Sequence, residues 1–231
     1  ARLYDARGDL VFGNLEAVLQ LTTNDDRTVQ SASWRAKTDR IMLAALQGKL
    51  PPNPFLPLTG WLDAEVWGQW SVGAGHQLTG TTDLRDALLV NEYQDIHLER
   101  VNSRFRWRYK GKGNWNLHLA DFLYDQGNAI WTTPRLSIAR NADEDLGLWI
   151  SADRLPLGVP LGLARDVMSI YETDLPGAVP VIADGEVSEL DLVLSSNWRV
   201  RMARGSVRNA SVSDWGQWPE LSGLNGEVAL S

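Results

Sequence analysis

The sequence predicts an all-β protein of consecutive, mainly antiparallel strands, each with one strongly apolar face. The clearest evidence is the stretch 101–110, where Phe105, Trp107 and Tyr109 alternate with basic residues. Alternation with a period of two places the apolar side chains on one side of a strand and the basic ones on the other. The Lys-Gly-Lys-Gly stretch at 110–113 then indicates a hairpin turn. Strands joined by such short turns favour a meander, a sandwich, a barrel or an open groove over βαβ units.

Earlier segments show the same pattern. Residues 15–23 and 28–37 flank the Asn-Asp-Asp stretch at 24–26, which predicts a hairpin. The segments 61–70 and 77–90 are long and alternate less regularly. Sequence alone does not say which parity of these long strands faces inward.

Alternation resumes directly after the 110–113 turn. Trp115, Leu117, Leu119 and Leu123 share one parity, which Asp121 interrupts. A turn is predicted at 126–128 and an acidic turn at 141–145. Further alternating segments lie at 135–139, 146–150, 190–194 and 198–202.

One short helix is predicted near residues 160–173, between two groups of strands. Pro160 suits the first position of a helix. Leu161, Ala164, Val167, Met168 and Tyr171 would share one helical face. Pro176 follows and would end the helix.

Composition excludes several classes of protein. An apolar fraction of 44% and a charged fraction of 22% are those of an ordinary folded chain. A net charge of -7 argues against a nucleic-acid partner, which would need a basic surface. The absence of cysteine excludes disulfides, thiolate metal sites and a cysteine nucleophile. No apolar run approaches the roughly 18 residues of a membrane helix.

The two ends of the sequence suggest a piece of a longer protein. The chain starts at Ala1 without a signal segment, and residues 227–231 resemble an unfinished strand. We therefore expect residues 1–231 to form a single β segment, with any membrane anchor outside it.

No constellation of residues predicts catalysis, a metal site or a cofactor. His76, His97 and His118 show no metal-ligand spacing, and a structural or solvent-facing role is expected for each. Gly73 and Gly75 lack the third glycine of a dinucleotide loop. The acidic stretch 143–145 lacks the spacing of an EF-hand and is expected to be a solvated turn.

Two features allow both a structural and a functional interpretation. The basic row Arg104, Arg106, Arg108 and Lys110 is expected to be the solvated side of a strand facing acidic neighbours, with anionic lipid headgroups or an anionic partner as the alternative. The eleven tryptophans are expected mostly to pack in the core or at edges. A minority could form a platform for sugar rings or an amphipathic rim for lipid.

Several motifs, in order, resemble the central region of the YhdP proteins, within the AsmA-like superfamily that also includes TamB. These motifs are residues 58–67 followed by 79–90, residues 115–124 followed by 131–139, residues 148–157, and the stretch WGQWPELSGLNG at 215–226. The last motif is the most specific. The resemblance covers most of the chain from about Leu58 onward, and residues 1–50 do not share it.

The resemblance implies a function in lipid transport. The resemblance implies that the chain belongs to a long β structure of the kind that is anchored in the inner membrane of Gram-negative bacteria. Such structures cross the periplasm as a curved sheet with a hydrophobic groove and move phospholipid toward the outer membrane. The implied partners are phospholipid, adjoining β-groove segments of the same chain and a membrane anchor outside it. The family offers no catalytic residue to transfer.

The apolar positions of the predicted strands are the candidates for a groove lining. They are Phe105, Trp107, Tyr109, Trp115, Leu117, Leu119, Leu136, Ile138, Leu148, Ile150, Leu192, Leu194, Val200 and Met202.

Three alternatives remain open at the level of sequence. The same residues could meet a second sheet and form a dry core. A tryptophan-rich β-sandwich could bind carbohydrate. An outer-membrane barrel would also alternate, although the predicted helix, the prolines and the uneven strand lengths count against it.

Overall fold

Eleven antiparallel strands form one open, unclosed sheet, so the predicted all-β class is confirmed. The computed structural model describes residues 12–46, 59–90, 95–127, 129–141, 146–158, 181–196, 199–213 and 221–230. The strands are β1 (Phe12–Thr23), β2 (Val29–Met42), β3 (Thr59–Ser71), β4 (Gly75–Val90), β5 (Asp95–Gly111), β6 (Asn114–Asp125), β7 (Ile130–Asn141), β8 (Leu146–Pro156), β9 (Val181–Ser195), β10 (Val200–Ser213) and β11 (Leu221–Leu230). A 3₁₀ helix, η1 (Leu43–Leu46), follows β2.

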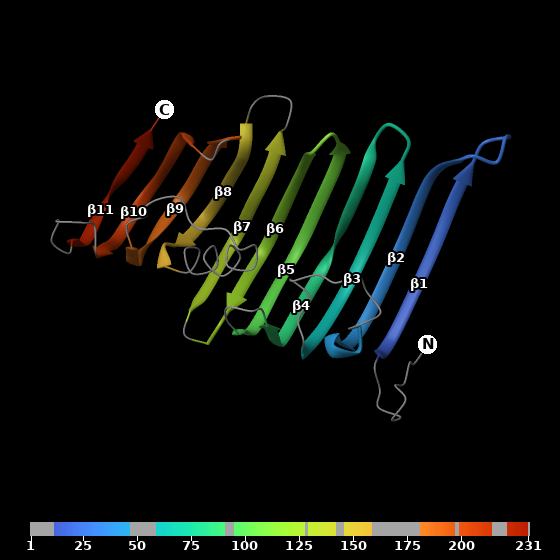
Figure 1. Cartoon of the computed structure of the whole chain (residues 1–231), viewed down its shortest axis with the longest axis horizontal. Coiled ribbons are helices and arrows are strands. Elements are labelled where there is room, and N and C mark those ends of the chain that lie inside the picture. The colour runs from blue at the N-terminus through green and yellow to red at the C-terminus, as the bar shows by residue number, and fades with distance from the viewer. Residues whose placement is uncertain are drawn as a thin grey trace.

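The order of strands in the sheet is the order in the sequence, from β1 at one edge to β11 at the other (Figure 1). Each strand therefore pairs with its sequence neighbours. The expected hairpin around residues 24–26 joins β1 to β2, and the turn at 110–113 joins β5 to β6. Among the described residues no second sheet faces the first, so this part of the chain does not have the sandwich architecture.

The tight turn between β3 and β4 requires glycine. Gly73 and Gly75 have φ values of 82° and 81°, in the left-handed region that glycine adopts without steric cost. A Cβ atom on Gly75 would also lie 2.1 Å from the carbonyl oxygen of Tyr109 on β5. These two glycines therefore allow the tight turn between β3 and β4, and Gly75 also allows β5 to approach closely.

Residues with positive φ inside the strands change which parity faces the core. In β6, Leu119 lies on the apolar side, Asp121 has a φ of 51°, and the buried residues that follow are Phe122 and Tyr124. The β5–β6 register shifts at the same place. This β-bulge moves Leu123 to the other face, so the expectation that Leu123, which has the parity of Leu119, also shares its face is wrong. Aspartate suits the bulge position 121, because its short polar side chain tolerates the left-handed conformation.

A bulge also explains the irregular alternation of β4. Asp86 has a φ of 50°, and the inward positions change from Leu84 to Ala87, which is 1% exposed. The sequence showed this change of phase only as poor alternation in residues 77–90.

The buried core lies on one face of the central strands, toward the end opposite the 110–113 turn. Its fully buried members are Ala87, Ile96, Leu98, Phe122, Tyr124, Trp131, Leu136 and Ala152. Phe122 and Trp131 meet edge to face with ring centroids 4.8 Å apart, a favoured aromatic geometry. The Trp131 Nε1 donates a hydrogen bond of 3.0 Å to the carbonyl oxygen of Arg154, which satisfies the polar end of the buried indole.

Three predicted features lie outside the described residues. They are the helix near 160–173, the acidic residues 142–145 and the first part of the motif at 215–226. In the described part of the chain, no helix has the length and apolar character needed to span a membrane.

Trp34 of β2 lies across Gly68 of β3, its partner in the β2–β3 register. A Cβ atom on Gly68 would lie 2.0 Å from the indole ring. The missing side chain therefore gives the ring its place on the sheet, an arrangement known as aromatic rescue of a strand glycine.

We expect Gly68→Val to destabilise the protein by about 1–3 kcal/mol, because the indole must leave its position over β3. Urea unfolding measures the change. Gly226→Val on β11 is the matched control, since open space surrounds Gly226 and the cost there should be small. Equal losses at the two positions would contradict the proposed role of Gly68.

Candidate functional site

The cross-strand register places one continuous line of apolar residues across the whole sheet. Side chains directly opposite each other in antiparallel strands project from the same face. Trp107 pairs with Leu78 on one side and Leu117 on the other, and Leu117 pairs with Ile138. The full line, here called the central line, is Leu19, Trp34, Gly68, Leu78, Trp107, Leu117, Ile138, Ile150, Leu192, Ala203 and Leu230.

The central line defines the apolar face of the sheet. Every member is apolar or glycine, and every strand contributes one. At a spacing of about 4.8 Å between strands, the line is about 48 Å long. The opposite side, called the charged face, carries most of the arginine side chains of the strands.

Most of the predicted lining residues share the apolar face. Phe105, Leu119 and Leu136 form a second line beside the central line. Tyr109 pairs with Trp115. Leu148, Leu194 and Val200 form a further line in β8 to β10. The candidates on the central line itself are Trp107, Leu117, Ile138, Ile150 and Leu192.

Met202 does not share this face, so its assignment to the lining is corrected. It pairs with Val193, whereas Leu192 pairs with Ala203 and Leu194 pairs with Val200. The register shifts between Val200 and Met202, and the extra residue turns Met202 to the charged face. Alternation within β10 alone could not reveal this shift.

Exposure of the apolar face differs between its centre and its edges. Leu136 is 5% exposed and belongs to the buried core, as expected for a packed interior. Toward the β1 edge, Leu19 and Leu21 are 64% and 54% exposed, and Leu230 at the other edge is 53% exposed. Exposed large apolar side chains in a contiguous surface mark an interaction site. Sequence reasoning missed Leu19, although its parity in β1 carried the signal.

Aromatic rings line the apolar face at the end of the sheet that carries the β1–β2, β3–β4 and β5–β6 turns, here called the hairpin end. Trp107 and Tyr109 are stacked, with centroids 6.0 Å apart and planes 8° apart. His76 lies 6.2 Å from Tyr109 and 6.4 Å from Trp70. Rings with an apolar body and a polar tip suit a boundary between apolar surface and water. His76 is exposed, in agreement with the predicted solvent-facing role.

On the charged face, several arginines form ion pairs with carboxylates on neighbouring strands. Ion pairs join Arg35 to Glu65 and Arg104 to Asp121. Arg135 lies 3.0 Å from Asp153, and Arg154 lies 3.1 Å from Glu186. For Arg104, the expected acidic neighbour is therefore confirmed.

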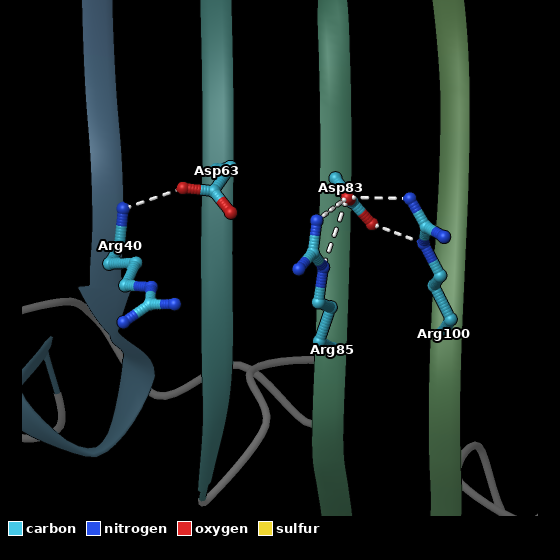
Figure 2. Close-up of polar contacts among 5 residues, drawn as sticks. All are labelled: Arg40, Asp63, Asp83, Arg85 and Arg100. Atoms are coloured by element: carbon cyan, nitrogen blue, oxygen red, sulfur yellow. Dashed lines mark hydrogen bonds and ion pairs between the residues drawn. The ribbon is translucent and has the colours of Figure 1, made fainter.

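A network around two aspartates connects β2 to β5 (Figure 2). Asp63 and Asp83 are directly opposed, which alone would be repulsive. Asp83 accepts hydrogen bonds from the guanidinium of Arg100 at 2.8 and 2.9 Å and from Arg85 Nε at 3.0 Å. Asp63 accepts a 2.7 Å hydrogen bond from the backbone N–H of Arg40, at a bulge with a φ of 56°. Each carboxylate thus has its own donors.

The donors of Asp83 shift its acidity. Hydrogen bonds from Arg100 above all, and then from Arg85, lower the pKa of Asp83 to about 2 from an ordinary value of 3.8, although partial burial opposes the shift. The ionised form is therefore favoured in the folded protein. Its stabilising contribution is complete above the unfolded-state pKa and is lost as the pH falls through 3.8 toward 2.

We expect Asp83→Asn to lower the free energy of unfolding by about 1–2 kcal/mol at pH 7, because the variant loses the charge-assisted bonds to Arg100 and Arg85. Urea unfolding at several pH values tests this. The gap between the parent and Asp83→Asn should narrow as the pH falls from 5 toward 2. A gap that does not change with pH would contradict the electrostatic explanation. Asp121→Asn, at a more exposed pair, should have a smaller effect at pH 7.

The described residues offer surfaces for binding. Among them no three or more histidine, aspartate or glutamate residues are grouped so as to hold a metal ion. No family model, curated protein or solved structure matches the chain. Function must therefore be inferred from the two faces of the sheet.

Proposed function

We propose that this chain is a non-enzymatic segment of a bridge-like lipid transport protein. The whole protein would be anchored in the inner membrane of a Gram-negative bacterium through a segment outside this chain. Its hydrophobic groove would carry phospholipid across the periplasm toward the outer membrane. The central line, which crosses all the described strands, is the observation that carries this proposal.

The energetics of lipid extraction demand such a surface. A diacyl phospholipid taken out of a membrane exposes about thirty methylenes, at about 0.8 kcal/mol each in water, or roughly 20 kcal/mol in total. A few apolar side chains cannot offset this cost. A lining to which every strand adds a residue can offset it, because the lipid then remains in apolar contact as it moves.

The open edges of the sheet suit a segment of a longer groove. Among the described strands, β1 pairs only with β2, and β11 pairs only with β10 (Figure 1). An edge strand presents unpaired N–H and C=O groups that another strand can bind. Further strands added at either edge would extend the central line beyond Leu19 or Leu230.

The resemblance to the YhdP proteins is a second support. Its paired motifs coincide with hairpins of the sheet: residues 58–67 and 79–90 fall largely in β3 and β4, and residues 115–124 and 131–139 in β6 and β7. Residues 148–157 correspond to β8. The motifs that carry the resemblance thus lie in β3, β4, β6, β7 and β8, each of which contributes a residue to the central line.

A photo-crosslinking side chain at position 117 should form adducts with phospholipid in bacterial membranes, because Leu117 lies on the central line. The same side chain at position 118 is the matched control. His118 is the next residue of β6 and projects from the charged face, where its Nδ1 lies 2.9 Å from Ser137 Oγ. Mass spectrometry of the crosslinked protein identifies the adducts.

Equal labelling at positions 117 and 118, or no lipid adduct at 117, would contradict the proposed function. Lipid extraction of the purified protein gives an independent measurement. The parent should retain phospholipid, and Leu117→Asp should retain less, since a carboxylate would interrupt the central line.

A further inference from the structure

The charged face contains two adjoining hollows near the hairpin end of the strands. One has a volume of about 510 Å³ and extends from β1 to β5. The other has a volume of about 390 Å³ and extends from β5 to β8. Arg108 and Lys110 line both, so the hollows meet at these two cations. Together they are here called the double hollow, and each has the size of a small-molecule site.

A row of uncharged polar side chains leads to the cations. Successive cross-strand partners from β1 to β6 are Gln20, Ser33, Gln69, Gln77, Arg108 and Asn116. All of them line the double hollow. Amide and hydroxyl groups both donate and accept hydrogen bonds, so this row is complementary to a ligand rich in hydroxyl groups.

The charge balance of the double hollow differs from that of the rest of the charged face. Its described lining residues include no carboxylate, although the chain has a net charge of -7. Arg35, Arg104 and Arg135 each pair with a carboxylate. Arg108 instead donates from Nε to the amide oxygen of Gln77 at 3.1 Å. The amide orients the guanidinium without neutralising it.

One side chain beyond Arg108 adds to this complementarity. Trp149 lies three strands from Arg108, about 14 Å away, and its Nε1 donates to Asp191. An indole fixed in this way offers a flat apolar surface to a sugar ring.

We propose that the double hollow binds an anionic saccharide, that is, a sugar bearing a phosphate or carboxylate group. Arg108 and Lys110 bind the oxyanion through charge-assisted hydrogen bonds. The row of glutamine and serine side chains binds the sugar hydroxyls, and Trp149 packs against a ring. This site is on the face opposite the central line and does not depend on the lipid function.

Titration of the full chain by isothermal calorimetry and NMR tests the proposal, with glucose 1-phosphate, glucuronate, glucose and inorganic phosphate as probes. Saturable binding is expected for glucose 1-phosphate or glucuronate, with weaker binding of glucose and of phosphate alone. Arg108→Gln should weaken the binding about tenfold or more, the loss typical of a charge-assisted hydrogen bond. Arg106→Gln is the matched control and should change it less than twofold, because Arg106 is exposed on the same face of β5 but lines neither hollow.

Gln77→Glu separates binding from folding. The new carboxylate would pair with Arg108 as Glu65 pairs with Arg35, so the fold should be retained while the oxyanion loses its partner. An unchanged thermal midpoint with at least tenfold weaker binding is the expected result. Unchanged binding in this variant would contradict the assignment of the cation pair.

A second arm distinguishes a free sugar from one carried by a lipid. Phosphatidylcholine vesicles with and without phosphatidylinositol present the same chemistry on a membrane. Binding to the phosphatidylinositol vesicles alone would assign the site to a lipid headgroup that bears a phosphate and a polyhydroxylated ring, and binding to the free probes would assign it to a soluble saccharide. The proposal is overturned if neither arm shows saturable binding, if inorganic phosphate binds as well as glucose 1-phosphate, or if Arg106→Gln and Arg108→Gln have equal effects.

Discussion

Backbone pairing between sequence neighbours, repeated without interruption from β1 to β11, is the constraint on which the structure depends. Directly opposed side chains in neighbouring strands project from the same face. The register of each pair therefore determines which side chains of the next strand join that face, and one line of apolar residues extends from Leu19 to Leu230. A shift of one residue in any strand would turn its apolar side chains to the charged face. The apolar surface is thus a property of ten consecutive pairings and of no single strand.

Bulges reconcile this pairing with a sequence that does not alternate perfectly. Asp86, Asp121 and Glu189 take positive φ values inside their strands, and the inward parity changes at each. The polar side chains remain at the surface while the apolar residues on both sides, such as Leu119 and Phe122, stay on one face. Arg40 shows how such a position is stabilised, because its backbone N–H donates to Asp63.

The two faces differ in how their side chains are satisfied. On the apolar face, burial in the centre gives way to exposed leucines near both edges, which suits a surface completed by a mobile apolar ligand. On the charged face, six arginines pair with carboxylates, and the double hollow is distinguished by a lining that, among the described residues, contains cations and no carboxylate. A single sheet can therefore offer two chemically distinct binding surfaces whose occupants do not compete for side chains.

Sequence alone determined the all-β class, the hairpins at 24–26 and 110–113, and the shared face of residues such as Trp107, Leu117 and Ile138, although it located only parts of β9, β10 and β11. Alternation and turn chemistry are local signals, readable within about ten residues. Only the tertiary structure decided that the described strands form one open sheet, that Leu123 and Met202 face the other way, and that Arg108 donates to Gln77 whereas Arg104 pairs with Asp121. These outcomes depend on the register between strands, which is set by hydrogen bonds and packing between separate segments. Within a single strand, a bulge shows at most as irregular alternation, as in residues 77–90.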